Sequence, residues 1–175
     1  WVEPSMDTSK HNPWVNPLTI AEVGLLVPSK VLDVGCGDGF YGSLLRDVVP
    51  ASEILGVDIN LRWSEVCEQT GFYDEVQNID IRAFQWKEFD LTILGDVLEH
   101  LNKSEALDIL GLAVAYSKWV IVNGPVGFQP QDHPDTWERH LCGITRSDFQ
   151  GMDVVTYQES SDGSMMNCVI KGRHE

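Results

Sequence analysis

The sequence predicts one α/β domain in which a doubly wound, mostly parallel sheet of seven strands carries helices on both faces. Three observations lead to this fold class. Short apolar runs alternate with segments of helical periodicity along most of the chain, which is typical of right-handed strand–helix–strand units. The last two apolar runs leave no room for a helix between them, so they predict a closing antiparallel hairpin. The length of 175 residues suits a single domain.

The first half of the chain alternates the two patterns. Apolar residues at helical spacing predict a helix at 40–49, and another at 62–71 that ends at a glycine suited to a helix C-cap. An earlier segment, 16–27, is interpreted as an extra amphipathic helix that packs on the sheet. Short apolar runs predict strands at 30–34, 53–58 and 75–79.

The second half continues the alternation and then closes the sheet. The segment 103–117 has apolar residues at helical spacing, and Asn102 with Glu105 resembles a capping box at its start. A short helix is predicted at 145–149. The turn residues 161–163 separate the final two runs. Strands are predicted at 89–96, 118–124, 152–160 and 164–172.

The charge of the chain disfavours one class of partner. The formal net charge is −15, from 12 Lys and Arg against 27 Asp and Glu. Nucleic-acid binding relies on Lys and Arg that neutralise phosphates, so this composition disfavours a nucleic-acid partner. No apolar run reaches the roughly 20 residues that a membrane helix needs, and we therefore expect no membrane partner.

Cysteine usage and the N-terminus bear on the compartment. The cysteines are scattered and form no C-x-x-C pair; they are Cys36, Cys67, Cys142 and Cys168. This pattern predicts a reduced, cytoplasmic protein without a disulfide framework. The first residues lack the basic region and apolar stretch of a secretion signal. They also lack an initiator Met, which leaves open a processed or truncated start.

The stretch VLDVGCGDGFYG, at 31–42, concentrates glycines directly after a predicted buried strand. Ligands of open α/β sheets bind beyond the carboxyl ends of the strands. Gly35, Gly37 and Gly39 can adopt positive φ and let a ligand approach the backbone. The alternative is a plain tight turn, but a turn rarely needs three alternate glycines behind such a strand. We therefore expect a ligand-binding loop.

Asp58 narrows the ligand to a nucleoside cofactor. It closes the second predicted strand about 20 residues after the glycine loop, where an acid can bind ribose hydroxyls. The alternative is a solvated acid at a strand end. Gly37, Gly39 and Gly42 also satisfy the G-x-G-x-x-G spacing of dinucleotide-binding proteins. NAD and S-adenosylmethionine both carry such a ribose, so these residues do not choose between them.

A resemblance then makes the choice. VLDVGCGDG resembles the first motif of class I S-adenosylmethionine-dependent methyltransferases, which implies a Rossmann-like methyltransferase fold with S-adenosylmethionine as cofactor. An acid at Asp33 suits the cationic amino group of the methionine tail, whereas dinucleotide loops usually keep this position apolar. The resemblance continues in order along LGVDIN (55–60), NIDIRAF (78–84), DLTILGDVLEHL (90–101), WVIVNGP (119–125) and ITRSDF (144–149).

The resemblance implies a cofactor site of several segments. Asp33 and the glycine loop would hold the methionine end, Asp58 the ribose, Ile59 one face of the adenine, and Asp80 with Ile81 its amino group. The residues from Gly95 to Val97 would form the floor beneath the sulfonium. Asp96 departs from the relatives, which often have a small or apolar residue there. The implied cofactor-binding residues are Asp33, Gly35, Cys36, Gly37, Gly39, Asp58, Ile59, Asp80, Ile81, Gly95, Asp96 and Val97.

A general base is needed only if the acceptor must lose a proton. His140 is the first candidate, because the segment around it resembles a substrate-side loop of some small-molecule members of the family. His133 and His100 are the other two catalytic candidates. Each has a plain alternative, namely a surface charge cluster, a turn residue or a packing residue. The His and Asp residues of 132–140 lack the spacing of a zinc site, and we expect no metal.

The expected organisation is one methyltransferase domain over 1–175, with an N-terminal arm, helix and possible lid at 1–29 and a substrate-side loop at 125–143. A long loop rich in Pro, His and Trp is more often functional than idle. The tetrapeptide that positions base amino groups in DNA methyltransferases is missing after the fourth strand, which together with the charge argues against a DNA methyltransferase. Because the chain is short and we expect no separate substrate domain, the sequence favours a small-molecule methyl acceptor, methylated on O or N. The alternatives are a non-catalytic cofactor-binding module and an NAD-dependent oxidoreductase. Monomer and homodimer both stay open.

Overall fold

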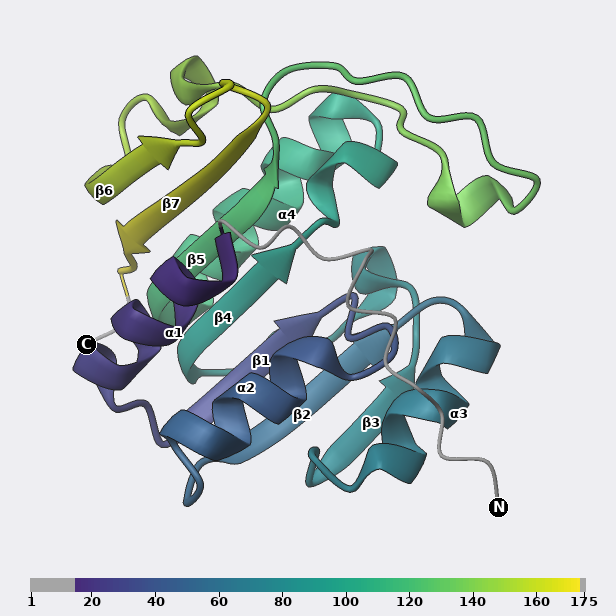
Figure 1. Ribbon diagram of the computed structural model, residues 1–175, viewed down its shortest axis with the longest axis vertical. Coiled ribbons are helices and arrows are strands. Elements are labelled where there is room, and N and C mark those ends of the chain that lie inside the picture. The colour runs from purple at the N-terminus through teal and green to yellow at the C-terminus, as the bar shows by residue number, and fades with distance from the viewer. Residues whose placement is uncertain (1–14, 174–175) are drawn as a thin grey trace.

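The computed structural model describes the backbone of residues 15–173 and the side chains of residues 21–173. One sheet of seven strands forms the centre of the molecule, in the order β3-β2-β1-β4-β5-β7-β6 (Figure 1). The strands are β1 (Lys30–Val34), β2 (Glu53–Asp58), β3 (Glu75–Asn78), β4 (Phe89–Gly95), β5 (Ser117–Pro125), β6 (Asp153–Glu159) and β7 (Met165–Lys171).

Five strands run parallel, and β7 pairs antiparallel with both β5 and β6. The predicted fold class and the closing hairpin are therefore confirmed. Strand ends differ from the prediction by no more than one residue at each end. For example, β5 begins one residue earlier and ends one residue later than the predicted 118–124. The hairpin turns at Gly163, whose φ of 70° lies in the left-handed region that glycine adopts without strain.

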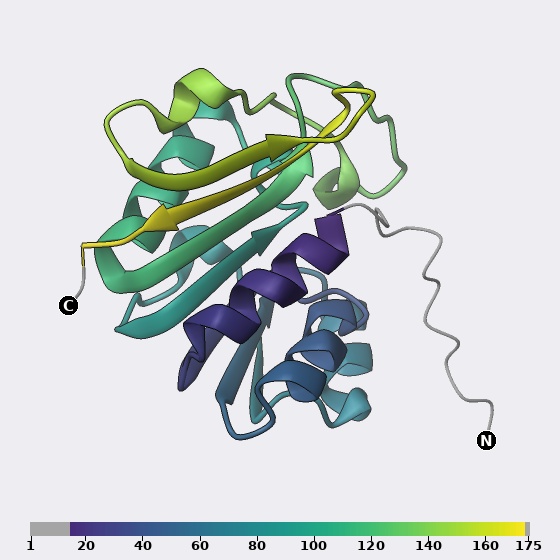
Figure 2. The same cartoon turned by 60° about the vertical axis from the view of Figure 1, so that its left-hand side comes forward.

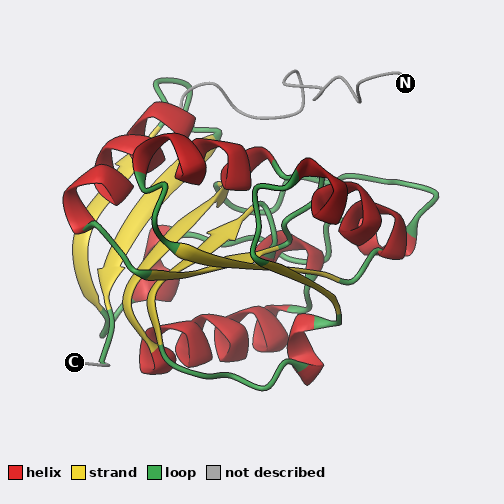
Figure 3. Ribbon diagram, turned by 90° about the horizontal axis from the view of Figure 1, so that it is seen from below, coloured by secondary structure: helices red, strands yellow, loops and turns green. Residues whose placement is uncertain are grey.

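Helices cover both faces of the sheet (Figures 2 and 3). The helices α1, α2 and α3 lie on one face and α4 lies on the other. Short 3₁₀ turns precede and follow α4 in the chain. The helices are α1 (Val15–Leu26), α2 (Phe40–Val48), α3 (Leu61–Thr70), α4 (Lys103–Tyr116) and the 3₁₀ turns η2 (Ile81–Ala83), η3 (Leu98–His100), η4 (Thr136–Glu138) and η5 (Arg146–Phe149).

The predicted helix ends follow local capping. The side chains of Asn102 and Glu105 form a reciprocal capping box at the start of α4, as predicted. Gly71 ends α3 with a φ of 71°, as expected of a left-handed C-cap. The first helix is confirmed, but its amphipathic character is not: Val23 is buried, whereas Leu25 is 84% exposed. The N-terminal arm as far as residue 14 lies outside the described residues.

Alternation along the strands divides the core into two layers. Leu32 and Val34 of β1 face α4, whereas Val31 faces α1 and α2. This is the period-two pattern of a strand buried on both sides. All four cysteines are free and buried, and Cys142 and Cys168 belong to the layer beside α4. Within residues 15–173, no helix is long and apolar enough to cross a membrane.

Two helical glycines should respond to alanine with opposite signs. A Cβ at Gly42 of α2 would overlap the Tyr73 ring, whereas a Cβ at Gly111 of α4 meets nothing. We expect Gly42→Ala to destabilise the fold by about 1–3 kcal/mol through overpacking. Gly111→Ala should stabilise it by about 0.5–1 kcal/mol through helix propensity. Urea unfolding of both variants measures the difference, and equal shifts would contradict the packing around Tyr73.

Candidate active site

The candidate site lies at the carboxyl edge of the parallel strands, where the loops after β1, β2, β4 and β5 meet (Figure 1). The register places Val34 beside Val57 and Leu94, and Leu94 beside Val122. The four strands therefore end at one level, and the residues that follow them are neighbours. Open α/β sheets bind ligands at this edge.

The glycine loop after β1 is held by its own backbone. Gly35 and Cys36 both donate N–H to the carbonyl of Val57, at 2.8 and 3.1 Å, and Gly39 donates to the carbonyl of Cys36 at 2.9 Å. Gly35, Gly37 and Gly39 have φ of 71°, 52° and 87°. All three predicted glycines therefore use left-handed backbone that most side chains disfavour.

The first two glycines have different neighbours. A Cβ on Gly35 would overlap the side chain of Val97, so this glycine lets the loops after β1 and β4 touch. A Cβ on Gly37 would meet nothing nearer than the Gly35 carbonyl, at 3.7 Å. Among the residues that the structure describes, no other atom beyond Gly37 and its chain neighbours lies within 4 Å of that Cβ position.

Asp58 is tied to the glycine loop. Its two carboxylate oxygens accept N–H bonds from Gly37, at 2.9 Å, and from Asn60, at 2.8 Å. Burial raises the pKa of Asp58 above its ordinary value of 3.8, these two N–H bonds oppose the rise, and the charge of Glu138 adds to it. A carboxylate has about four acceptor positions, so Asp58 can still accept hydrogen bonds from ligand hydroxyls.

Asp33 belongs to β1, directly before the glycine loop. Its side chain is 0% exposed, and its Oδ2 accepts a hydrogen bond of 2.6 Å from the Tyr73 hydroxyl. The same hydroxyl accepts the N–H of Gly42 at 2.9 Å. Burial and the charge of Asp33 raise the pKa of Tyr73 well above 10, so the hydroxyl stays protonated. A direct contact between Asp33 and a ligand stays a prediction.

Tyr73 also explains the third glycine of the G-x-G-x-x-G spacing. Its ring fills the space where side chains at Gly42 and Gly56 would lie. Gly42 is thus needed for packing within the protein. The match to the dinucleotide motif at this position therefore does not require a pyrophosphate. Sequence reasoning missed Tyr73, because a tyrosine before the third strand has no signature of its own.

The loop after β3 places Asp80 and Ile81 at the same edge. Asp80 forms an ion pair with Arg82 at 2.6 Å and accepts the N–H of Arg82 at 2.9 Å. Ile81 is buried, and Ile59 after β2 is half-buried. The apolar pair and the carboxylate agree with an adenine-binding role, which stays a prediction.

The turn after β4 has an unusual backbone. Asp96 has a φ of 51°, a conformation uncommon outside glycine but tolerated by Asp. Its N–H donates to the Asn123 carbonyl at 3.0 Å. Gly95 lies against the Tyr41 ring, where a Cβ would clash. The predicted floor from Gly95 to Val97 is thus a fixed turn that also contacts the glycine loop.

The other end of this turn meets the long loop after β5. The Glu99 carbonyl accepts N–H bonds from Leu141, at 2.7 Å, and Cys142, at 3.2 Å. The Cys142 thiol donates to the Leu98 carbonyl at 3.3 Å. These bonds bring His140 to His100, with ring centroids 5.0 Å apart in an edge-to-face arrangement.

Glu99, His100 and His140 form a cluster whose potential ligand atoms all lie within 4.8 Å of one another. Glu99 is 3% exposed; burial, and then the charge of Asp96, raise its pKa well above 4.5. Burial lowers the pKa of His100. Two of the three histidines named from the sequence therefore meet at the predicted acceptor side.

His133 lies apart from this pair. Its side chain is exposed, and its Nδ1 accepts the N–H of Asp135 at 3.2 Å. This bond lies within the tip of the loop. It agrees with the alternative, given in the sequence analysis, that His133 is a turn residue. The same tip reaches the loop after β2, where the Asn60 amide donates to Asp135 at 3.4 Å. The segment 126–143 thus spans the edge from β5 to β2.

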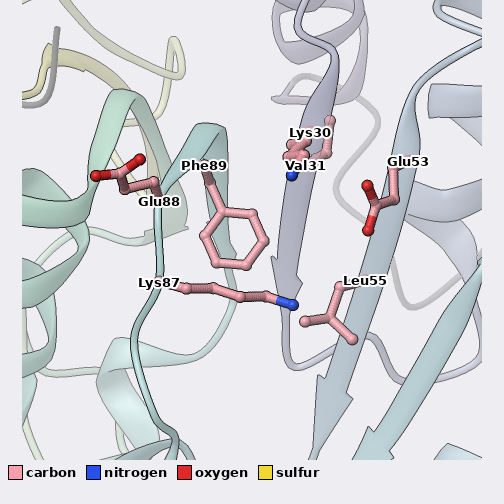
Figure 4. Close-up of a pocket in the computed structure, with 7 residues that line it drawn as sticks. All are labelled: Lys30, Val31, Glu53, Leu55, Lys87, Glu88 and Phe89. Carbon is pink, nitrogen blue, oxygen red and sulfur yellow. The ribbon is translucent and has the colours of Figure 1, made fainter.

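A small hollow elsewhere on the molecule is unrelated to this edge. It lies where β1, β2 and β4 begin, at the opposite ends of these strands. The Lys87 side chain extends beneath the Phe89 ring toward Leu55 (Figure 4). The residues that line it are Lys30, Val31, Glu53, Leu55, Lys87, Glu88 and Phe89.

Comparison with known proteins identifies the family. Residues 31–116 match the family model described as a methyltransferase domain. These residues are a methyltransferase domain, and the described chain has the Rossmann-like fold of class I S-adenosylmethionine-dependent methyltransferases. A search of curated proteins returned no match.

Solved structures share the fold of this methyltransferase. The N-terminal domain of EvdMO1 with S-adenosylhomocysteine bound is 15% identical with a TM-score of 0.68, and the match covers 97% of this chain and 85% of that one. The magnesium protoporphyrin IX methyltransferase of Synechocystis PCC 6803 with bound S-adenosylmethionine is 18% identical, with 91% and 79% covered and a TM-score of 0.67. The plantazolicin methyltransferase BpumL with S-adenosylhomocysteine is 13% identical, with 95% and 87% covered and a TM-score of 0.70.

Substitution of Gly37 should separate cofactor binding from folding. Gly37 and Gly71 both have positive φ, and neither has a neighbour that a Cβ would clash with. Alanine at either position should destabilise the methyltransferase by about 1–2 kcal/mol through left-handed backbone. We expect only Gly37→Ala to lower the affinity for S-adenosylhomocysteine, because its methyl group would lie in the space of the ligand. A steric cost of about 1.4 kcal/mol would lower the affinity about tenfold. Calorimetric titration with Gly71→Ala as control tests this, and equal affinities would refute the role of the loop.

The Tyr73 hydroxyl should contribute to stability. Tyr73→Phe keeps the ring but removes the donor to the buried Asp33, which should cost about 1–3 kcal/mol. Tyr116 of α4 is 39% exposed, and the structure describes no hydrogen bond of its side chain. Tyr116→Phe should therefore change little. Urea denaturation of both variants measures their free energies of unfolding. An unchanged value for Tyr73→Phe would exclude the hydrogen bond to Asp33 as a stabilising contact.

Proposed function

We propose that this methyltransferase transfers the methyl group of S-adenosylmethionine to an oxygen or nitrogen of a small-molecule acceptor. One observation carries the proposal. The turn from Gly95 to His100 contacts two other segments. Val97 lies against Gly35 of the glycine loop, and His100 packs edge-to-face against His140 of the loop after β5. A cofactor on the glycine loop would thus lie beside the turn that leads to the two imidazoles.

The loop after β5 supports a small acceptor with an apolar part. Phe128, Trp137 and Leu141 are 57%, 48% and 51% exposed on this loop. Large exposed apolar side chains near a polar cluster are typical of binding surfaces. The net charge of −15 weighs against a nucleic-acid acceptor.

The relatives narrow the acceptor no further. One is named for magnesium protoporphyrin IX and another for plantazolicin, so the shared fold accommodates different acceptors. We expect the loop 126–143 to determine which acceptor this chain binds, because it extends from the end of β5 to the loop after β2.

The proposed reaction is an in-line displacement. The acceptor's lone pair forms the new bond to the methyl carbon, the carbon–sulfur bond breaks, and its electron pair goes to the sulfur. The chain contributes by positioning the two reactants and excluding water. His140 and His100 each direct Nδ1 to a backbone carbonyl, at 2.6 and 3.2 Å, which leaves Nε2 for the acceptor side. Within this proposal they are the candidate proton acceptors, and His133 is not.

The predicted location and assembly belong to the same proposal. Four free, buried cysteines agree with a cytoplasmic protein. Both monomer and homodimer fit the proposed reaction.

Methyl transfer should depend on the glycine loop. We expect transfer of labelled methyl from S-adenosylmethionine to a member of a panel of small hydroxylated or amine-bearing acceptors, and its loss in Gly37→Ala. Gly71→Ala should keep activity, because Gly71 lies at the end of α3. The readout is label in the acceptor and equal release of S-adenosylhomocysteine. Cofactor binding without transfer to any acceptor would favour the non-catalytic module.

A further inference from the structure

We propose that Glu99, His100 and His140 bind a divalent transition-metal ion, with Zn²⁺ as the first candidate. Glu99 and His100 belong to η3, and His140 comes from the loop after β5. Their ligand atoms already lie within 4.8 Å of one another. Ligands around tetrahedral Zn²⁺ with bonds of about 2.1 Å lie about 3.4 Å apart, so small side-chain rotations bring the three atoms into range.

The hydrogen bonds of the two imidazoles fix the form that a metal requires. The Nδ1 of His140 lies 2.6 Å from the Gln129 carbonyl, and the Nδ1 of His100 lies 3.2 Å from the Arg139 carbonyl. A carbonyl can only accept, so each Nδ1 donates a proton to it, and Nε2 is the nitrogen of each ring that is left to bind a metal. Metal-binding histidines commonly donate their other ring N–H to a backbone carbonyl in this way.

The cluster is held in place before any ion binds. The Glu99 carbonyl accepts from both Leu141 and Cys142, and the Cys142 thiol donates to the Leu98 carbonyl. The carboxylate of Glu99 lies against Gly124 of β5, where an added Cβ would lie 3.5 Å from Oε2. Backbone bonds on both sides of His140 and His100 thus fix the separation of the ligands.

The local charge favours a cation. Glu99 is a buried acid, and among residues 21–173 no Lys or Arg forms an ion pair with it. The two nearby cations are engaged elsewhere. Lys103 binds the Gly143 carbonyl and Asp148, and Arg139 directs its guanidinium to the His133 carbonyl. A bound metal ion would stabilise the ionised form of Glu99, which no Lys or Arg among residues 21–173 does through an ion pair.

Two imidazoles and one carboxylate also indicate the class of metal. Imidazole suits Zn²⁺, Co²⁺, Fe²⁺ and Ni²⁺, whereas Mg²⁺ prefers oxygen ligands alone. Three protein ligands leave at least one position open, as in catalytic rather than structural zinc sites. This departs from the sequence-based expectation of no metal, which rested in part on the spacing within 132–140 and did not combine Glu99 and His100 with His140.

The open position suggests how the metal acts in the proposed methyl transfer, on which this step rests. It would take a hydroxyl oxygen of the acceptor and lower the pKa of that hydroxyl. The proton then goes to water, the oxygen forms the bond to the methyl carbon, and the carbon–sulfur pair returns to the sulfur. With a metal bound, the two imidazoles would serve as ligands, and this role would replace the role of proton acceptor that they have in the metal-free proposal above.

Direct metal titration tests the site. Tag-free protein, stripped with chelator, is titrated with Co²⁺ while the visible absorption is recorded, and then with Zn²⁺ to displace it. We expect one ion per chain with absorption bands of four- or five-coordinate Co²⁺, and no displacement by equal Mg²⁺. His100→Ala and His140→Ala should each lower the affinity by about 100-fold or more, since even outer-shell changes cost 10–100-fold.

His133→Ala is the matched control, because His133 is an exposed histidine of the same loop. It should keep Co²⁺ binding. Binding that His100→Ala and His140→Ala leave unchanged, displacement by Mg²⁺, or no binding to the wild-type chain would overturn the proposal. S-adenosylhomocysteine titration of the same variants shows that they are folded; should they not fold, His140→Gln replaces them. Loss of cofactor binding with Co²⁺ binding retained would instead contradict the proposed methyl transfer.

Discussion

The Tyr73 hydroxyl bonded to Asp33 is the interaction on which the cofactor side depends. A carboxylate in the middle of a buried strand is costly unless it is hydrogen-bonded, and Tyr73 supplies that bond at 2.6 Å. The same ring holds α2 through the Gly42 amide and lies over Gly56. The position of α2, and hence of the glycine loop that leads into it, follows from this contact.

A second constraint joins the two halves of the site. The short segment from Gly95 to His100 contacts the glycine loop through Val97 and the loop after β5 through Glu99. The left-handed Asp96 turns the chain between these contacts. Residues that serve the cofactor and residues that serve the acceptor are therefore fixed relative to each other by one turn, which suits a reaction governed by alignment.

Local patterns were sufficient for most of the fold. The strand runs, the capping box of Asn102 and the C-cap at Gly71 depend on neighbours in sequence, and the structure confirms them. The first helix was predicted as amphipathic, yet Leu25 is exposed. Its position depends on packing against α2 and β7, which its own periodicity does not determine.

The sequence by itself determined the sheet, the glycine loop and the family, because these rest on short-range periodicity and contiguous motifs. It also named His140 as the first catalytic candidate and His133 and His100 as the others, but it could not show which of the three lie together. Only the tertiary structure placed His100 beside His140 and left His133 at the loop tip. That outcome depends on hydrogen bonds between segments some 40 residues apart, such as His100 to Arg139, and pairings at such separation leave no local pattern in a single sequence.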